Sequence, residues 1–99
     1  MEGVDMVYVV VDHEVADYAK WKPVFDKHAE TRKKSGSKGG TLFLISGEPN
    51  HPCILFEWDK KENATKFIES EDLKKTMQDA GVIGKPGVWL LDKIEDFKV

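Results

Sequence analysis

The feature that most constrains the fold of this chain is a set of short segments that are apolar on both faces. Residues 6–11 read Met-Val-Tyr-Val-Val-Val, with an aspartate at each end. Residues 41–46 and 53–58, and residues 88–91 at the start of a last segment, are similarly rich in β-branched and aromatic side chains, as strands are. Alternate side chains of a strand point to opposite faces, so each segment presents apolar groups on both. A sheet with one solvated face would alternate apolar and polar residues instead.

The first long interval between these segments has the period of an amphipathic helix. Residues 14–35 carry an apolar stripe opposite a charged one. Asp17 is a suitable N-cap for the part that begins at Tyr18, and Gly36 is a suitable residue after the last turn. Pro23 lies inside the stretch and has no N–H to donate, so we expect the helix to kink or restart there.

A second helical interval follows residues 53–58. Asp59, with Glu62 three residues later, resembles a capping box. Ser70 is suited to cap a further helical segment, which Gly81 would end. The sequence therefore predicts helical structure between the third and the last strand.

The order of these elements is β-α-β-β-α-β, and the glycine-rich stretches 35–40 and 84–87 are expected to be loops. Right-handed crossovers favour an α+β, ferredoxin-like arrangement, in which a four-stranded antiparallel sheet has two helices on one face. The length of 99 residues suits a single domain over residues 1–99.

The sheet face away from the helices needs a cover. Residues 95–99 are one candidate, but three of these five residues are charged. The same face of a second copy is the better cover, because it buries a large apolar patch in a two-fold contact. We therefore predict a homodimer through the sheet face, a dimeric α/β barrel.

Charge and composition narrow the classes of partner. The net charge is −3 and the pI is about 5.6, which disfavours nucleic acid. Met1–Asp5 has no basic n-region, and residues 7–11 are too short to span a membrane, so we expect a cytoplasmic protein without a membrane partner. The single cysteine, Cys53, has no partner for an internal disulfide. One local basic cluster comprises Arg32, Lys33, Lys34 and Lys38. It is either a weak anion-binding patch or, the interpretation that we favour, a solvated helix end.

Two polar residues interrupt the apolar stripe of the first helix. His28 and Arg32 are one turn apart on the side that carries Tyr18, Trp21 and Phe25. A histidine and an arginine beside aromatic rings suit a pocket for a phenolic or acidic small molecule, with His28 as acid or base and Arg32 as anion holder. The alternative is a half-buried His28 bonded to a backbone carbonyl, with Arg32 extending to water.

Metal and cofactor motifs are absent from the sequence pattern. His13, His28 and His51 are far apart and have no tight ligand spacing, so no metal site is predicted. Residues 35–40 lack the spacing of a phosphate-binding loop, and no cofactor is predicted. His51 and Cys53 share a strand face, but positions i and i+2 are about 6–7 Å apart, which is too far for a ready nucleophile pair.

Four segments resemble small proteins of the antibiotic-biosynthesis-monooxygenase-like, dimeric α/β-barrel superfamily. They are residues 15–28 (Val-Ala-Asp-Tyr-Ala-Lys-Trp-Lys-Pro-Val-Phe-Asp-Lys-His), 56–59 (Phe-Glu-Trp-Asp), 62–67 (Glu-Asn-Ala-Thr-Lys-Phe) and 77–82 (Met-Gln-Asp-Ala-Gly-Val). Together they extend over most of the chain. The resemblance implies a ferredoxin-like fold, a sheet-to-sheet dimer and a cleft between helices and sheet in each subunit.

The resemblance also implies classes of chemistry. Characterised members include cofactor-free oxygenases of phenolic polyketides, haem-degrading enzymes, and isomerases or cyclases of small rings. None of their complete catalytic sets maps onto this chain, although His28 and Trp58 are residue types that such sites use, and Trp58 joins the predicted ligand pocket on that ground. Two hypotheses follow: a cofactor-independent monooxygenase or cyclase/isomerase, and a non-catalytic ligand-binding or regulatory dimer.

Overall fold

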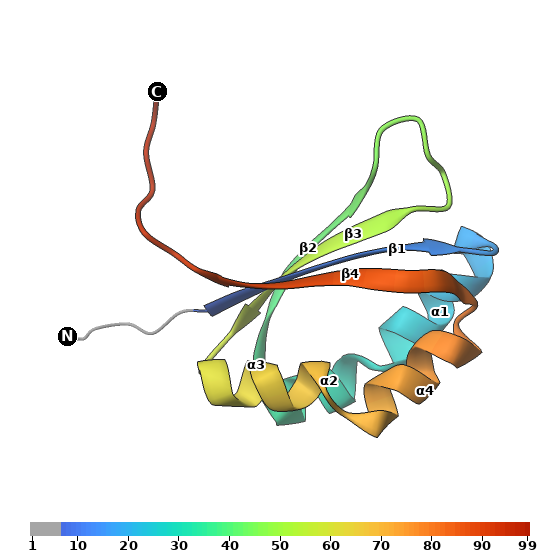
Figure 1. Cartoon of the computed structure of the whole chain (residues 1–99), viewed down its shortest axis with the longest axis horizontal. Helices are drawn as coiled ribbons and strands as arrows, with labels where there is room; N and C mark the ends of the chain where they lie inside the picture. The colour runs from blue at the N-terminus through green and yellow to red at the C-terminus, as the bar shows by residue number, and fades with distance from the viewer. Residues whose placement is uncertain (1–6) are drawn as a thin grey trace.

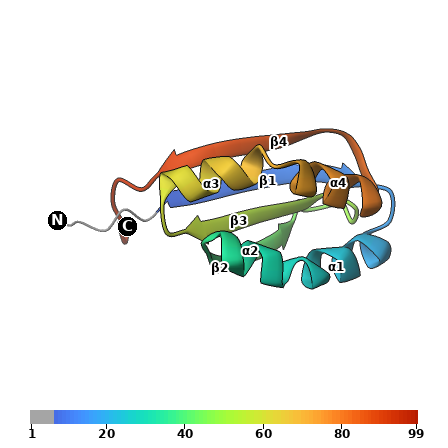
Figure 2. The same ribbon diagram turned by 90° about the horizontal axis from the view of Figure 1, so that it is seen from below.

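The structure, a computed structural model, describes residues 7–99, so Met6 of the first predicted strand lies outside it. The elements are β1 (Val7–Val15), α1 (Tyr18–Lys27), α2 (Ala29–Ser35), β2 (Ser37–Leu44), β3 (Pro52–Trp58), α3 (Lys61–Ile68), α4 (Glu71–Asp79) and β4 (Val82–Asp92). The strands form one sheet in the order β2-β3-β1-β4, with every neighbouring pair antiparallel. All four helices lie on one face of that sheet (Figures 1 and 2). The predicted ferredoxin-like α+β fold is confirmed. The first predicted helix is divided into α1 and α2, and the second interval contains α3 and the further predicted segment, α4.

The first predicted helix begins at its expected cap but divides at an unexpected residue. The Asp17 carboxylate accepts a hydrogen bond from the Ala19 N–H at 2.9 Å. Pro23 lies inside α1 without ending it, and the division falls at His28, whose N–H donates to the Val24 carbonyl at 3.1 Å. α2 then ends at Gly36, whose φ of 117° is the left-handed conformation that glycine adopts readily.

Of the two helix caps predicted in the second helical interval, the structure contains the one at Ser70 and not the one at Asp59. The Ser70 hydroxyl accepts from the Leu73 N–H at 3.1 Å and caps α4, as expected. The predicted capping box at Asp59 is wrong, because α3 is preceded by Lys60 and has no side-chain cap. The Asp59 carboxylate instead accepts from Asn63 Nδ2 at 3.0 Å.

Both glycine-rich stretches expected to be loops belong largely to strands. Residues 37–40 pair with β3, with a register shift between Ser37 and Gly39. Gly40 passes so close to the Leu55 carbonyl that a Cβ there would collide with it, which is the physical reason for glycine within this strand. Residues 84–87 lie in β4 opposite an irregularity between Asp12 and Glu14, so this stretch forms a bulge and not a loop.

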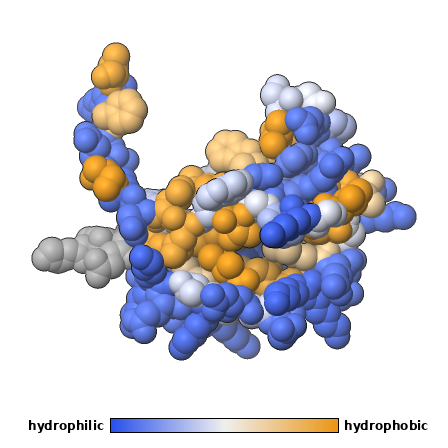
Figure 3. Space-filling view, in the orientation of Figure 1, coloured by the Kyte–Doolittle hydropathy of each residue, from blue (hydrophilic) through white to orange (hydrophobic). Residues whose placement is uncertain are grey.

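The sheet is apolar on both faces, as the sequence predicts. The buried side chains of β1 and β3 that face the helices are Val7, Val9, Val11, Ile54, Phe56 and Trp58. Trp21, Ala64 and Phe67 from the helices pack against them. On the opposite face Phe43 and Trp89 are each 52% exposed. Apolar surface is visible over the strands above the polar helices in Figure 3.

Among the helices of residues 7–99, none has the length and apolar character needed to cross a membrane.

Candidate functional site

An apolar cleft of about 50 Å³ lies between the sheet and the helices, and all four helices contribute to the layer that covers it. Trp21, only 3% exposed, fills much of this space. Its ring stacks on Phe25 with centroids 4.9 Å apart, and Phe25 in turn lies 6.3 Å from the Phe56 ring. The cleft is therefore lined by aromatic rings and is nearly filled by its own side chains.

The structure brings most of the predicted site residues to this cleft. Four of the six predicted residues line it: Trp21, Phe25, His28 and Arg32. Tyr18 is half-buried and packs on Trp21 at a centroid distance of 5.6 Å, outside the lining. Trp58 is fully buried and packs on Phe67 at 4.9 Å, also outside the lining. The roles predicted for these residues stay predictions.

His28 has a carboxylate partner. Its Nε2 lies 2.9 Å from Oδ2 of Asp72 in the first turn of α4. The His28 side chain is 10% exposed, and within residues 7–99 its Nδ1 forms no hydrogen bond. A carboxylate on one ring nitrogen orients an imidazole and leaves the lone pair of the other for proton transfer. His28 therefore does not bond to a backbone carbonyl, the arrangement that would have given it a purely structural role.

Arg32 places a positive charge at the edge of the cleft. Its Nη1 donates to the Phe25 carbonyl oxygen at 2.8 Å, and its guanidinium carbon lies 4.0 Å from the Phe25 ring centroid. Burial lowers the pKa of the guanidinium, and Asp26 opposes that shift. An arginine side chain stays charged at neutral pH even so. The side chain is half-buried against an aromatic ring and does not simply extend to water.

His13 is a cleft residue that the sequence analysis did not single out. Its side chain is 5% exposed, and neither ring nitrogen has a hydrogen-bond partner within residues 7–99. Burial lowers its pKa to about 4, against a smaller opposing effect of Asp12. The ring is therefore neutral at pH 7, with one donor and one acceptor nitrogen. It shares the inward side of β1 with Val11, so extending the strand alternation by two residues would have found it.

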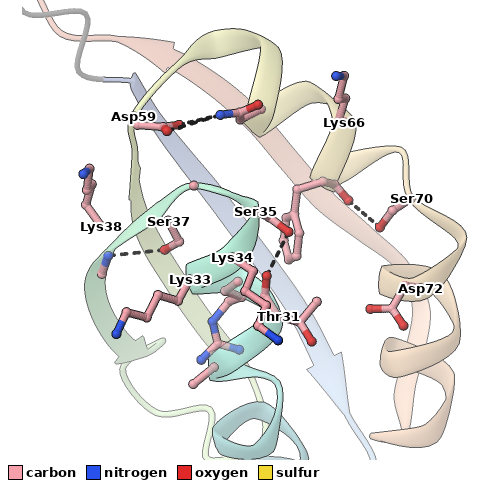
Figure 4. Close-up of a pocket in the computed structure, with 16 residues that line it drawn as sticks. Thr31, Lys33, Lys34, Ser35, Ser37, Lys38, Asp59, Lys66, Ser70 and Asp72 are labelled. Carbon is pink, nitrogen blue, oxygen red and sulfur yellow. Dashed lines mark hydrogen bonds between the residues drawn. The ribbon is translucent and has the colours of Figure 1, made fainter.

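A second and larger depression, of about 960 Å³, lies beside the cleft between α2 and α3 (Figure 4). Arg32 and Phe67 border both spaces, and Asp72 lines the larger one. We call it the basic groove, because its charged lining residues are Arg32, Lys33, Lys34, Lys38 and Lys66 against Asp59 and Asp72. Lys66 joins the cluster that the sequence suggested was a solvated helix end.

A separate polar cluster, formed by His51, Asp12 and Glu48, lies on the outer side of the sheet. His51 lies 3.0 Å from Asp12 through Nε2 and 3.1 Å from Glu48 through Nδ1, and the Asp12 hydrogen bond is the main cause of its raised pKa. Burial raises the pKa of the Cys53 thiol, which keeps it protonated and a poor nucleophile. Across residues 7–99, no three metal-ligating side chains gather closely enough to hold an ion.

The sequence matches no family model, and the search of curated proteins gave no match. Solved structures do resemble the chain. SnoaB, a cofactor-independent oxygenase from Streptomyces nogalater, is 16% identical with a TM-score of 0.76, over 93% of this chain and 96% of that one. A candidate antibiotic biosynthesis monooxygenase from Caulobacter crescentus is 21% identical with a TM-score of 0.72, over 92% of both chains.

A third similar structure is a dimeric ferredoxin-like protein from an uncultured marine organism. It is 14% identical with a TM-score of 0.61, over 96% of this chain and 93% of that one. Identities this low establish shared architecture and not shared chemistry. The chain therefore has the ferredoxin-like fold of the antibiotic-biosynthesis-monooxygenase-like proteins, as its sequence resemblance implied.

Proposed function

We propose that the cleft binds a small phenolic molecule and oxygenates it without a cofactor, with His28 as the acid–base residue. The observation that carries this proposal is the His28–Asp72 pair at the wall of an apolar, aromatic-lined cleft. The oxygenase SnoaB has the same fold, which supports the reaction class. A cyclase or isomerase acting on a phenolic or acidic molecule belongs to the same proposal, because it needs the same proton transfer.

The chemistry needs only the substrate, molecular oxygen and a base. With its proton on Nε2 toward Asp72, His28 takes the phenolic proton at Nδ1. The phenolate is electron-rich and donates electrons to O₂, so one oxygen atom enters the ring and the other leaves as water. A phenol and O₂ thereby give a quinone and water, with the substrate oxidised and O₂ reduced. The charge of Arg32 stabilises the phenolate, and the apolar walls strengthen that interaction.

Binding a ring requires side chains to move. The cleft volume of about 50 Å³ is smaller than the roughly 150 Å³ of a cavity that binds benzene. Met77 lines the cleft, and methionine is the side chain best able to change shape. His13 offers a hydrogen bond to the substrate once the ring is inside. The proposal therefore favours a single ring or the edge of a larger ring system.

We also propose that the chain forms a homodimer through the outer face of the sheet. Phe43 on β2 and Trp89 and Leu91 on β4 are exposed at the two edges of this face. The half-buried side chains of Leu55 and Val10 lie between these edges on the two central strands. A contiguous apolar patch of this kind is typical of an interface. One of the structures with this fold is a dimeric ferredoxin-like protein, which supports the same assembly.

The alternative function is non-catalytic binding or regulation. The observation that favours it is the packing of Trp21, which leaves little free volume beside His28. Under this alternative the cleft holds an apolar acid or completes the core, and replacing His28 changes affinity or stability alone.

Oxygen uptake with a panel of phenols and hydroquinones separates these functions. We expect uptake and quinone formation by the wild type, at least about 100-fold slower turnover in His28→Ala, and no change in His51→Ala, a histidine outside the cleft. Turnover without oxygen uptake would identify a cyclase or isomerase. Unchanged turnover in His28→Ala would contradict the role of His28, and binding without any turnover would support the non-catalytic alternative.

A further inference from the structure

The basic groove is an accumulation of positive charge on an acidic protein. Lys33 and Lys34 come from the last turn of α2, Lys38 from β2 and Lys66 from α3. Two stretches that are separate in sequence, residues 33–38 and the helix α3, thus contribute cations to one depression, although the whole chain carries a net charge of −3. A single solvated helix end would not account for Lys66, which belongs to α3.

These cations have few local counterions. Within residues 7–99, Lys33, Lys34 and Lys66 form no ion pair with a carboxylate, whereas Lys22, Lys74 and Lys93 elsewhere on the surface do. Of the two acids in the groove, Asp72 forms a hydrogen bond with His28, and Asp59 accepts one from Asn63. Lys38 lies near Asp59 and contributes to the lowered pKa of that carboxyl, after the Asn63 hydrogen bond. The groove therefore has a positive surplus that is available to an added anion.

The groove and the cleft meet along shared residues. Arg32 and Phe67 border both, so a ligand with its ring in the cleft would direct a substituent past Arg32 into the groove. Figure 4 shows Lys33 and Lys38 on the α2–β2 side and Ser70 and Asp72 on the opposite side of the opening. The groove volume of about 960 Å³ is far larger than that of the cleft, so size does not limit the substituent.

We infer that the basic groove is a subsite for a doubly charged oxyanion, of the phosphate-monoester type, carried on the ring that occupies the cleft. The placement of the ring rests on the proposed function, whereas the anion site rests on the groove alone. A ligand with a single carboxylate would need Arg32 alone, because a guanidinium presents a planar pair of N–H donors to a carboxylate. Several additional lysines on the rim match a group with more than one charge, because an ammonium attracts phosphate as a point charge from any direction.

Titration calorimetry and amide chemical-shift mapping with phenyl phosphate, inorganic phosphate and phenol test this inference. The groove variant is Lys33→Glu/Lys34→Glu. The matched control is Lys74→Glu/Lys75→Glu, an adjacent pair on α4 that does not line the groove and changes the net charge equally. We expect the groove variant to weaken phenyl phosphate binding by at least about tenfold at low salt, and the control by less than about twofold. Phenol binding should be the same in both.

Equal weakening in the two variants would overturn the inference, because it would reveal general charge attraction and no local site. Failure of both phosphate compounds to bind at millimolar concentration would overturn it as well. Phosphate shifts confined to the groove, with no phenol binding in the cleft, would keep the anion site and overturn the proposed function of the cleft. Circular dichroism of both variants establishes that they are folded.

Discussion

Oδ2 of Asp72 lies 2.9 Å from Nε2 of His28, although 44 residues separate them in the sequence. This contact joins the first turn of α4 to the junction between α1 and α2. It also links the two spaces of the candidate site, because His28 lines the cleft and Asp72 lines the basic groove. Both the proposed acid–base chemistry and the orientation of the imidazole depend on it.

Replacing Asp72 by alanine should impair turnover far more than stability. The carboxylate is largely exposed, so its loss should cost less than about 1 kcal/mol of unfolding free energy. The imidazole loses its orienting partner, so we expect kcat to fall by at least about tenfold. Glu71→Ala removes the neighbouring first-turn charge without touching His28 and serves as control. Similar kcat values for the two variants would contradict the orienting role of Asp72.

The buried His13 should make the fold sensitive to acid. Its pKa of about 4 in the folded protein lies below the ordinary value of 6.5, so the unfolded state binds a proton more readily. Stability from this group is present above pH 6.5 and is lost as the pH falls toward 4, by on the order of 2 kcal/mol. Urea unfolding at pH 7 and pH 4.5 should show the wild type losing stability relative to His13→Phe. A pH-independent difference between them would show that His13 is not buried neutral.

His51 should have the opposite dependence on pH. Its pKa is raised by Asp12 and Glu48, so the folded state holds the proton more strongly than the unfolded state. The stabilisation is complete below pH 6.5 and disappears as the pH rises through the folded-state value. Relative to His51→Gln, the wild type should therefore be more stable at pH 6 than at pH 8.5, measured by urea unfolding. A greater advantage at pH 8.5 would show that His51 does not pair with Asp12 and Glu48 in solution.

A charge on the outer sheet face should dissociate the proposed dimer. Trp89 is 52% exposed on β4, and a buried tryptophan at an interface commonly contributes about 2 kcal/mol or more to association. We expect Trp89→Lys to be monomeric at micromolar concentration by light scattering, while the wild type is dimeric. Ala19→Lys places the same charge on the exposed surface of α1 and should stay dimeric. A monomeric wild type at the same concentration would contradict the proposed homodimer.

Gly36, which follows α2, and Gly39, near the start of β2, offer a paired test of backbone conformation. Both have a left-handed φ, of 117° and 114°, which costs a residue with a Cβ about 1–2 kcal/mol. A Cβ on Gly36 would also lie within 2.5 Å of the Asp59 carboxylate, whereas one on Gly39 would meet nothing within 4 Å. Gly36→Ala should therefore lower the free energy of unfolding more than Gly39→Ala. Equal losses would mean that Asp59 moves aside freely.

Some features of the site and fold could be read from local sequence because local interactions decide them. Asp17 and Ser70 cap α1 and α4 through hydrogen bonds to residues two or three positions away. The alternation of Val7, Val9 and Val11 with Tyr8 and Val10 assigned both faces of β1, because the period of a strand is two. The stripe that carries Trp21, Phe25, His28 and Arg32 faces the cleft because residues three or four positions apart share one side of a helix.

Tertiary contacts decided what local rules could not. Glycine signals favour loops, yet residues 37–40 became strand because β3 supplies partners for Ser37, Gly39 and Gly40. Residues 84–86 form a bulge within β4, between Ile83 and Gly87, which are both paired with β1. The carboxylate on His28 comes from a helix residue 44 positions away in the chain, and the fourth groove lysine, Lys66, lies at least 28 positions from the other three. Sequence by itself determined the periodicities, caps and apolar faces, which depend on neighbours within one or two turns. Only the packing of four helices on one sheet determined the cleft, the His28–Asp72 pair and the basic groove. Each of them is formed by segments that are distant in sequence and come into contact only in the folded chain.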